Sequence, residues 1–282
     1  MNARNIRRIA VSVIWVIAFI VWALWDHGSS HHHDGHSAST QQQPSEQEQG
    51  GQGSGQGQNA QTSGGSLDFG SIKDFTLALS WEPGFCRDHG QRDECRNAGD
   101  TPLTLHGFWP GVPASLGRQG VSRGDWYHDG CMAVDHQSEG SFCSFPKPQL
   151  SSNVRQSLES AMPGVQSCLD RHEYAKHGAC FNISADQYFS HATRLYQQVS
   201  QSRFAQWLKS HRGQQVARQD VISTFGSTFK TSGRSLMVMC DGSDYLTELR
   251  IGINGSHLND FPASDSFSRL GNGRCGSQVK IP

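Results

Sequence analysis

Residues His172–Cys180 read HEYAKHGAC, and this stretch places four ionisable side chains within six positions. At about 100° per residue, a helix would hold all four on one face, with Tyr174 and Ala175 on the opposite side. Gly178 follows directly and is a typical residue at the end of a helix. The stretch therefore predicts a short helix with one chemically active face. The side chains on that face are those of His172, Glu173, Lys176 and His177.

The chemistry of this face has two interpretations. Two imidazoles, a carboxylate and an ammonium group can transfer protons near neutral pH and stabilise a developing anion. The alternative is a solvent-facing helix with an ordinary Glu173–Lys176 ion pair at i, i+3. A zinc site of the H-E-x-x-H type is disfavoured because it needs histidines at i and i+4. Here Lys176 occupies i+4 and its charge would oppose a metal ion, so we predict no metal site.

A second segment, Leu103–Pro110 (LTLHGFWP), carries another histidine. Its apolar start predicts a buried strand that ends at His106 and is followed by glycine and an aromatic pair. Such a segment would hold one imidazole at the edge of a cleft, with Trp109 as a stacking surface beside it. The alternative is a core histidine next to a packed tryptophan. Neither segment is decisive alone, and together they favour a catalytic site.

The flanking sequence predicts a mixture of strands and helices. Short apolar runs indicate buried strands, and apolar residues at helical spacing indicate helices. Near the C-terminus, two apolar runs flank the residues 241–244 (DGSD), which is a hairpin signal. Without strict βαβ alternation we expect an α+β fold, a single disulfide-stapled domain with a central, mainly antiparallel sheet packed by helices. The expected strands are 75–81, 103–106, 235–240 and 245–253, and the expected helices are 149–161, 184–200 and 204–211.

The N-terminal part differs from this domain in composition. Residues 9–25 form an uncharged apolar run of 17 residues that follows three arginines. The run fits either a cleaved signal peptide or an uncleaved membrane anchor, and both remain open. Residues 26–66 contain no Val, Ile, Leu, Met, Phe, Trp or Tyr, which predicts a disordered linker rich in Gln, Gly and Ser. We therefore expect residues 1–25 to direct export, 26–66 to be a linker and 67–282 to be the catalytic domain.

Charge and cysteine content narrow the class further. Of the net charge of −1, the first 25 residues contribute +3 and residues 26–66 contribute −4. The remainder is neutral, which argues against a protein that holds nucleic acid through a broad basic face. All eight cysteines lie between Cys86 and Cys275, and no pair has C-x-x-C spacing. This even set predicts up to four disulfides in an oxidising compartment, periplasmic or extracellular.

Together, LTLHGFWP and HEYAKHGAC resemble the two signatures of the T-two ribonuclease family, the acid, base-non-specific endoribonucleases. The usual forms are Leu or Ile-His-Gly-Leu-Trp-Pro and His-Glu-Trp-x-Lys-His-Gly-Thr-Cys. Order and separation also fit, and the resemblance covers roughly residues 70–282. The departures at Phe108, Tyr174 and Ala179 remove no proton-transfer group. Gly111 stands where some members carry an acid that helps hold the base, which leaves the base preference open.

The resemblance implies a mechanism. His177 is the expected general base on the 2′-oxygen of RNA, and His106 is the expected general acid for the 5′-oxygen leaving group. The product would be a 2′,3′-cyclic phosphate that is later hydrolysed to a 3′-phosphate. We expect single-stranded RNA as substrate, no cleavage of DNA, no metal or organic cofactor, and a monomeric protein. The expected supporting residues are Lys176, Glu173 and His172 for the phosphate and transition state, and Trp109 for a stacked base.

The resemblance also favours a disulfide pattern. The resemblance suggests one pairing near the start of the domain and one near its C-terminus, and it implies that Cys180 joins an upstream cysteine. The expected disulfides are Cys86–Cys95, Cys240–Cys275, Cys143–Cys180 and, by remainder, Cys131–Cys168.

Two other functions fit the sequence less well. An RNA-binding protein on the same scaffold, with catalysis lost, is disfavoured because all five catalytic positions of the family are present. A metal-dependent hydrolase is disfavoured by the histidine spacing described above. An assay of RNA cleavage in the presence of a chelator distinguishes the metal-independent ribonuclease from the RNA-binding protein and from the metal-dependent hydrolase.

Overall fold

The computed structural model describes residues 67–97, 101–134, 140–271 and 273–282. The expected export segment (residues 1–25) and linker (residues 26–66) lie outside the described residues, so both stay predictions. Within the ranges described, no helix is both long enough and apolar enough to span a membrane.

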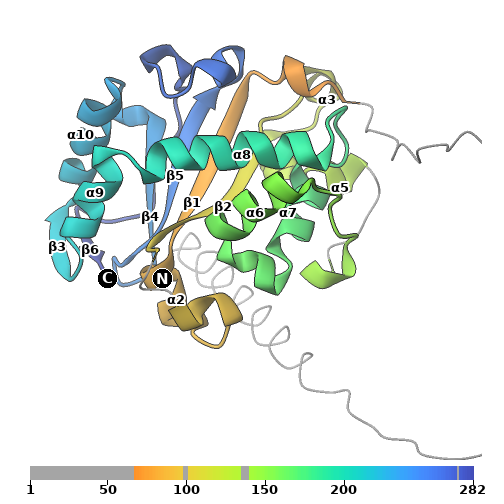
Figure 1. Cartoon of the computed structure of the whole chain (residues 1–282). Helices are drawn as coiled ribbons and strands as arrows, with labels where there is room; N and C mark the ends of the chain where they lie inside the picture. The colour runs from red at the N-terminus through yellow and green to blue at the C-terminus, as the bar shows by residue number, and fades with distance from the viewer. Residues whose placement is uncertain (1–66, 98–100, 135–139, 272) are drawn as a thin grey trace, which may run out of the picture. The chain divides into compact units, whose positions relative to one another are not determined.

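Six strands form two antiparallel sheets in the described part of the chain (Figure 1). They are β1 (Asp74–Trp81), β2 (Leu103–Pro110), β3 (Gln214–Ala217), β4 (Leu236–Cys240), β5 (Leu246–Asn254) and β6 (Gln278–Ile281). The larger sheet has the order β2-β1-β5-β4, and β3 pairs with β6 in the smaller one. The predicted α+β class with a mainly antiparallel sheet is confirmed, and so is the hairpin that joins β4 to β5.

The predicted helices 149–161, 184–200 and 204–211 are all present, with different ends, and the structure has further helices that were not predicted. Residues 184–200 form the long helix expected, and Ser184 caps it by accepting from the backbone of Gln187, whose side chain returns the contact. The helix predicted from residue 149 begins at Ser152, because Ser151 has an extended backbone. The α-helices are α2 (Glu82–His89), α3 (Ala114–Arg118), α4 (Arg123–Asp129), α5 (Cys131–Val134), α6 (Ser152–Ala161), α7 (Leu169–His177), α8 (Ala185–Ser200), α9 (Arg203–Ser210) and α10 (Arg218–Phe229). The short 3-10 helices are η1 (Phe69–Ser71), η2 (Asp93–Asn97), η3 (Phe142–Ser144), η4 (Pro163–Ser167), η5 (Gly233–Ser235), η6 (Gly255–Asp260) and η7 (Ser264–Ser266).

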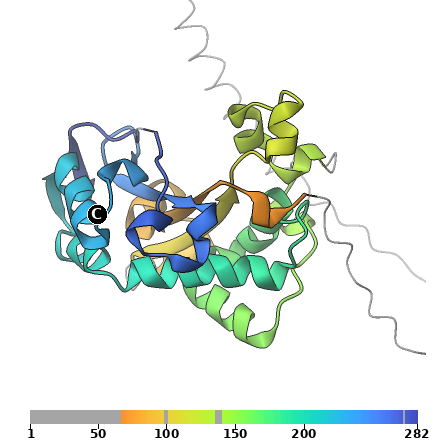
Figure 2. The same cartoon turned by 90° about the horizontal axis from the view of Figure 1, so that it is seen from above.

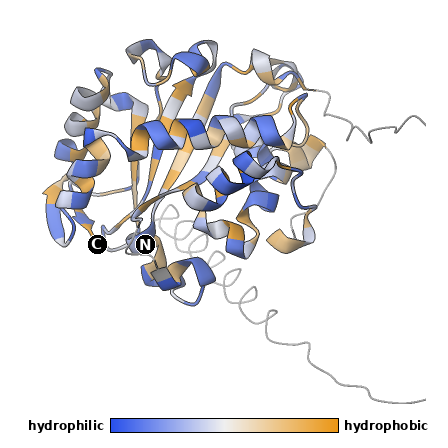
Figure 3. Cartoon of the chain, viewed as in Figure 1, coloured by the Kyte–Doolittle hydropathy of each residue, from blue (hydrophilic) through white to orange (hydrophobic). Residues whose placement is uncertain are grey.

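The larger sheet has an apolar face and a polar face. Leu105, Leu79 and Leu249 lie side by side across its first three strands and are fully buried. They belong to the same hydrophobic cluster as the buried side of α8, which crosses the sheet (Figure 1), and the hydrophobic colouring follows the strands (Figure 3). Burial of each such leucine stabilises the fold by about 1.5–3 kcal/mol. Seen from above, α4 lies on the opposite side of the sheet from α8 (Figure 2), beside the polar face that carries the site described below.

Four disulfides close the described domain, and two of the four predicted pairings are wrong. The predicted Cys86–Cys95 and Cys240–Cys275 are confirmed. In place of Cys143–Cys180 and Cys131–Cys168, the structure has Cys131–Cys180 and Cys143–Cys168.

The reason for the correction is the packing at the two ends of α7. Cys168 precedes this helix and Cys180 follows it. Because a helix rises about 1.5 Å per residue, the two cysteines lie at opposite ends of α7 and cannot bond to the same part of the chain. At the start of α7, Arg171 donates a 2.9 Å hydrogen bond to the carbonyl of Cys143. At its end, a Cβ at Gly130 would lie only 2.2 Å from the carbonyl oxygen of Lys176. The segment before Cys131 therefore packs at the C-terminal end, which the order of cysteines in the sequence does not reveal.

Candidate active site

The predicted helix with four ionisable side chains is α7, and it ends at His177 as expected. The backbone N–H of Gly178 donates to the carbonyl of Tyr174 and closes the last turn. Behind the polar face, Ala175 is buried in a small cluster with Met132 and Phe145. Because α7 packs on β2, its polar face meets the strand that carries the other predicted histidine.

His106 occupies a bulge in β2. Gly107 pairs with Ala78 and Leu105 pairs with Leu79, which leaves His106 as the extra residue between them. The prediction that the strand ends at His106 is therefore wrong, since β2 continues to Pro110. A bulge lets a strand continue while one side chain is redirected. The His106 side chain is 33% exposed, as a residue at the edge of a cavity should be.

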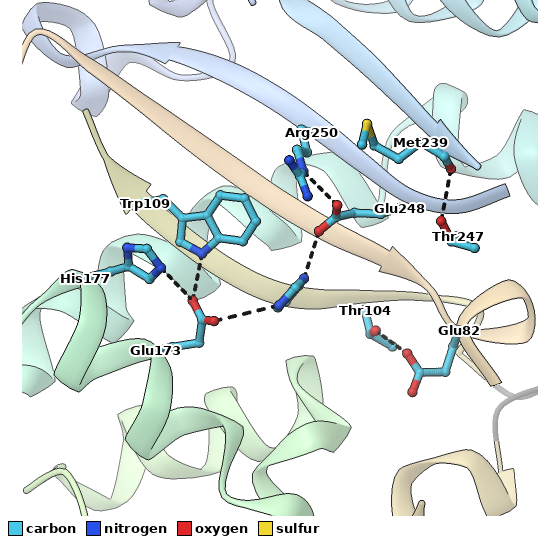
Figure 4. Close-up of polar contacts among 10 residues, drawn as sticks. Glu82, Thr104, Trp109, Glu173, His177, Met239, Thr247, Glu248 and Arg250 are labelled. Carbon is cyan, nitrogen blue, oxygen red and sulfur yellow. Dashed lines mark hydrogen bonds and ion pairs between the residues drawn. The ribbon is translucent and has the colours of Figure 1, made fainter. Parts of the chain in front are cut away.

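The carboxylate of Glu173 lies between the two imidazoles (Figure 4). Its Oε1 is 3.7 Å from Nε2 of His106, and its Oε2 is 4.0 Å from Nε2 of His177. The same Oε2 accepts a 2.7 Å hydrogen bond from Nε1 of Trp109. A Cβ at Gly107 would lie 2.0 Å from this oxygen, so only glycine permits the approach. The two sequence segments thus interlock at Gly107 and Glu173.

Trp109 packs among these groups, with 8% of its surface exposed. Its ring lies near-parallel to that of His177, with centroids 5.5 Å apart. Tyr127 of α4 meets Trp109 edge to face at 5.8 Å and is 52% exposed. Sequence analysis missed Tyr127, which supplies the more accessible aromatic surface. Its only signal is a tyrosine next to a buried tryptophan in an otherwise polar helix.

Sequence analysis also missed two charged residues of β5, Glu248 and Arg250. Oε1 of Glu248 lies 2.8 Å from Nδ1 of His106, and Oε2 accepts a 2.6 Å hydrogen bond from Nε of Arg250. The Arg250 guanidinium lies 5.0 Å from the ring centre of Trp109 and 5.5 Å from that of Tyr127. The available signal was two charges at i and i+2 in an apolar strand, a spacing that puts both on one face.

These groups meet in one cavity of about 170 Å³. All five residues predicted to be catalytic line it, together with Trp109 and two residues that were not predicted. The lining consists of His106, Trp109, Tyr127, His172, Glu173, Lys176, His177 and Arg250.

Comparison with known proteins decides the family. Residues 72–264 match the sequence model of the Ribonuclease T2 family. The chain belongs to this family. The resemblance described from its two segments is confirmed, and the protein is a ribonuclease.

Two relatives and one solved structure illustrate the match. The chain is 35% identical over 233 residues to Ribonuclease I of Escherichia coli, which covers 76% of this chain and 87% of that protein. It is 27% identical over 157 residues to a probable ribonuclease of Haemophilus influenzae, half of each chain. The SF11-RNase of Nicotiana alata, associated with self-incompatibility, superposes with a TM-score of 0.50 at 17% identity over 74% of this chain and 98% of that one. That likeness shows the shared fold.

In this ribonuclease the pKa of His106 is raised above its ordinary value. Burial of the imidazole opposes its charged form. The hydrogen bond to Glu248 and the negative charges of Glu248 and Glu173 outweigh burial, and Arg250 offsets them in part. His106 is therefore the imidazole that holds its proton to higher pH.

The pKa of His177 moves in the opposite direction, well below its ordinary value. Burial is the main cause, and the positive charges of Lys176, His172 and His106 add to it. Among the described residues, Nδ1 of His177 is buried without a hydrogen-bond partner. The pKa values of the two imidazoles are therefore shifted in opposite directions.

Two further cavities share residues with the central one. A cavity of about 430 Å³ shares Trp109, Tyr127 and His177, and a cavity of about 180 Å³ shares His106 and His172. A polymeric substrate therefore has room on either side of the two imidazoles. The first is also lined by Lys73, Arg123 and Arg269, and the second by Glu82, Glu94, Phe85 and Phe142.

One group in the described ranges has the composition of a metal site, namely Glu82, Cys86 and Cys95. Both cysteine sulfurs are joined to each other in a disulfide. Because a metal ligand must be a thiolate, this group lacks the donors that a zinc site needs.

Proposed function

We propose that this protein is a metal-independent endoribonuclease that cleaves single-stranded RNA, with little base specificity, through attack of the 2′-hydroxyl on the adjacent phosphorus. The observation that carries the proposal is the pair of imidazoles, His106 and His177, that face one cavity with the Glu173 carboxylate between them. The carboxylates of Glu248 and Glu173 raise the pKa of His106, whereas burial and the neighbouring positive charges lower the pKa of His177. General acid–base catalysis needs such a pair.

In the first step His177 accepts the proton of the 2′-hydroxyl, and the 2′-oxygen bonds to phosphorus. The bond from phosphorus to the 5′-oxygen breaks, and that oxygen takes a proton from Nε2 of His106. The products are a 2′,3′-cyclic phosphate and a 5′-hydroxyl. In the second step the roles reverse: His106 accepts a proton from water, and the water oxygen bonds to phosphorus. The bond from phosphorus to the 2′-oxygen breaks, that oxygen takes a proton from His177, and the product is a 3′-phosphate. Since the nucleophile belongs to the substrate, the enzyme supplies mainly proton transfer and charge stabilisation.

Lys176, Glu173 and His172 stabilise the phosphate and the transition state in this proposal. Burial raises the pKa of Glu173, although His106, Trp109 and Lys176 oppose the shift. The negative charge of Glu173 favours the protonated form of His106, which needs that proton for the leaving group. Lys176 contributes the positive charge that a metal ion would otherwise supply, which supports a reaction without metal or organic cofactor.

Stacking is the expected mode of base binding, with Trp109 and Tyr127 as the aromatic surfaces. Stacking contributes about 1–3 kcal/mol per base and tolerates sequence variation. Gly111 lines the same cavity as these rings and has no side chain to contact a base edge. A Cβ at Gly111 would lie 2.8 Å from the carbonyl of Asp74, so an acid is not easily accommodated there. Little base specificity follows.

A DNA oligonucleotide that carries a single ribonucleotide tests the proposal. We expect one cut, immediately after the ribonucleotide, with a 2′,3′-cyclic phosphate end detected by mass spectrometry, in the presence of EDTA. The all-DNA and the 2′-O-methyl versions should stay intact, because both lack the free 2′-hydroxyl. Cleavage of the all-DNA strand, or activity that EDTA abolishes, would indicate a metal-dependent hydrolase. Binding of the strand without a cut would indicate an RNA-binding protein.

We also propose that the enzyme is exported, to the periplasm or the medium, and acts as a monomer. The four disulfides support this location, because such bonds persist in oxidising compartments. Residues 9–25 would then be a signal peptide or a tether. Cell fractionation, N-terminal sequencing of the exported protein and light scattering test these three points. Activity confined to the cytoplasm would contradict export.

A further inference from the structure

The hydrogen bond between His106 and Glu248 joins two strands that are not neighbours in the sheet. Since β1 lies between β2 and β5, the contact spans two strand spacings, about 10 Å. At this level β1 has small side chains, because Ser80 pairs with Glu248 and Ala78 pairs with Arg250. Across them, Oε1 of Glu248 reaches within 2.8 Å of Nδ1 of His106. The intervening strand thus leaves space for the contact.

Both strands are bulged where they make this contact. In β2 the extra residue is the histidine itself. In β5 it is Thr247, because Met239 pairs with Glu248 while Cys240 pairs with Leu246. The hydroxyl of Thr247 donates a 3.2 Å hydrogen bond to the carbonyl of Met239, which holds the second bulge (Figure 4). Bulges redirect side chains next to functional sites, and each residue of this hydrogen bond lies at or next to one.

Glu248 is held from its other side by Arg250. Nε of Arg250 donates a 2.6 Å hydrogen bond to Oε2, so each carboxylate oxygen has its own partner (Figure 4). Only 9% of Glu248 is exposed, and burial opposes its charged form. The contacts with His106 and Arg250 outweigh burial and lower the pKa of Glu248. Glu248 is therefore a carboxylate over the range in which His106 titrates.

We propose that Glu248 is a positioning residue for the general acid, whose carboxylate accepts the Nδ1–H of His106 and thereby directs the transferable proton to Nε2. The inference rests on the proposed function, in which His106 protonates the leaving 5′-oxygen. A protonated imidazole carries a proton on each nitrogen, and a neutral one keeps only one. With Nδ1–H bound to Glu248, the proton that leaves is the one on Nε2, which faces the cavity beside Glu173. After the transfer, Nε2 is free to accept a proton from water in the second step.

Groups from several elements face His106 and act on its charge. Glu248 and Glu173 favour the protonated form, and Arg250 opposes it. Loss of the Glu248 charge should therefore lower the pKa of His106 and move the alkaline limb of the activity profile to lower pH. The titratable or charged groups around His106 are Glu173, His172, Lys176 and His177 of α7, Glu248 and Arg250 of β5, Tyr127 of α4, Glu82 of α2, and Arg92 and Glu94 across the 180 Å³ cavity.

The test compares two substrates on the full-length protein. One is a dinucleotide, whose 5′-oxygen needs a proton in order to leave, and the other is a ribonucleoside 3′-(4-nitrophenyl phosphate), whose phenolate leaves without one. The variants are Glu248→Gln, which removes the charge, and Glu248→Asp, which keeps it. Glu159→Gln, at an exposed position of α6, is the matched control.

We expect Glu248→Gln to lower kcat/KM for the dinucleotide about 10- to 100-fold, part of the 10²–10⁴-fold that a general acid contributes. The alkaline limb should move to lower pH while the acid limb stays in place. Activity on the nitrophenyl ester should change less than about threefold, and Glu248→Asp should recover part of the dinucleotide activity. Equal losses on both substrates, or an unmoved alkaline limb, would show that Glu248 has a merely structural role.

His106→Ala separates this inference from the proposed function. If His106→Ala loses activity equally on both substrates, the assignment of His106 as the acid is wrong and not only the role of Glu248. If Glu248→Gln does not fold, NMR of histidine-labelled wild-type protein tests the inference by identifying which nitrogen of His106 carries the proton. We expect the neutral imidazole of His106 to carry its proton on Nδ1, and a proton on Nε2 would overturn the inference.

Discussion

The candidate active site has a helical half and a sheet half, and they differ in both origin and charge. The helical half comes from six consecutive residues of α7, where burial and the positive charges of Lys176 and His172 lower the pKa of His177. The sheet half is assembled from β2 and β5, residues far apart in sequence, and its Glu248 carboxylate raises the pKa of His106. One fold thus gives two chemically identical side chains opposite tendencies to hold a proton, and Glu173 is the point where the halves meet.

Removal of either imidazole should have the largest effect on activity. His177→Ala and His106→Ala should each lower kcat for RNA by about 10²–10⁴-fold, because each supplies one proton transfer. Their stabilities should differ. His106→Ala leaves the buried Glu248 without one partner and should lower the free energy of unfolding by about 1–3 kcal/mol at neutral pH.

His177→Ala breaks no hydrogen bond at Nδ1, and Glu173, which lies 4.0 Å from Nε2, keeps its hydrogen bond from Trp109. Thermal unfolding and steady-state kinetics of the two variants measure both effects, with His257→Ala in η6 as the control. Retention of RNA cleavage in either variant would disprove the role assigned to that histidine.

The junction of the two halves is tested at Gly107. A Cβ there would lie 2.0 Å from Oε2 of Glu173, so Gly107→Ala should push α7 away from β2. Overpacking of this kind costs about 1–3 kcal/mol, and we expect activity to fall with it. Gly242→Ala is the matched control, because a Cβ at that position would meet no atom of the described residues within 4 Å. Urea unfolding of both variants gives the difference, and equal stabilities would mean that the close approach does not matter.

The two halves also differ in how far the sequence predicts them. The sequence predicts the helical half residue by residue, because 3.6-residue periodicity converts spacing directly into a shared face. It identifies His106 and Trp109 but not the bulge that redirects His106, because β2 reads as one apolar run. It misses Glu248 because the contact of this residue crosses β1, and strand order is not encoded locally.

The two wrong disulfide predictions have the same cause as the failure to predict Glu248. Cys131 and Cys143 both precede α7 in sequence, and which of them reaches which end depends on tertiary packing. The two correct pairings, Cys86–Cys95 and Cys240–Cys275, came from the family resemblance and not from spacing. The fold class, by contrast, follows from local patterns and is predicted correctly.

Lys176→Met tests how the positive charge of Lys176 affects His177, and the pH profile of kcat/KM is the measurement. His177 must be neutral to accept a proton, so the acid limb should lie below the ordinary histidine pKa, which its lowered pKa implies. His106 must be protonated, so its raised pKa should carry the alkaline limb above that value. Loss of the Lys176 charge raises the pKa of His177 and should move the acid limb to higher pH, with about a tenfold lower maximum. Movement of the alkaline limb alone would mean that the two histidines have exchanged roles.

The smallest expected effect concerns base binding. The most exposed aromatic ring at the site belongs to α4, which is part of neither the helical half nor the sheet half. Trp109 stacks on His177 and is 8% exposed, whereas Tyr127 is 52% exposed beside it. Tyr127→Ala should therefore raise KM for a dinucleotide about fivefold, the lower end of what one stacked base contributes, and leave kcat unchanged. Tyr127→Phe keeps the ring and should behave as the wild type. An unchanged KM in Tyr127→Ala would show that the base does not stack on Tyr127, and the open surface of α4 would then have no part in base binding.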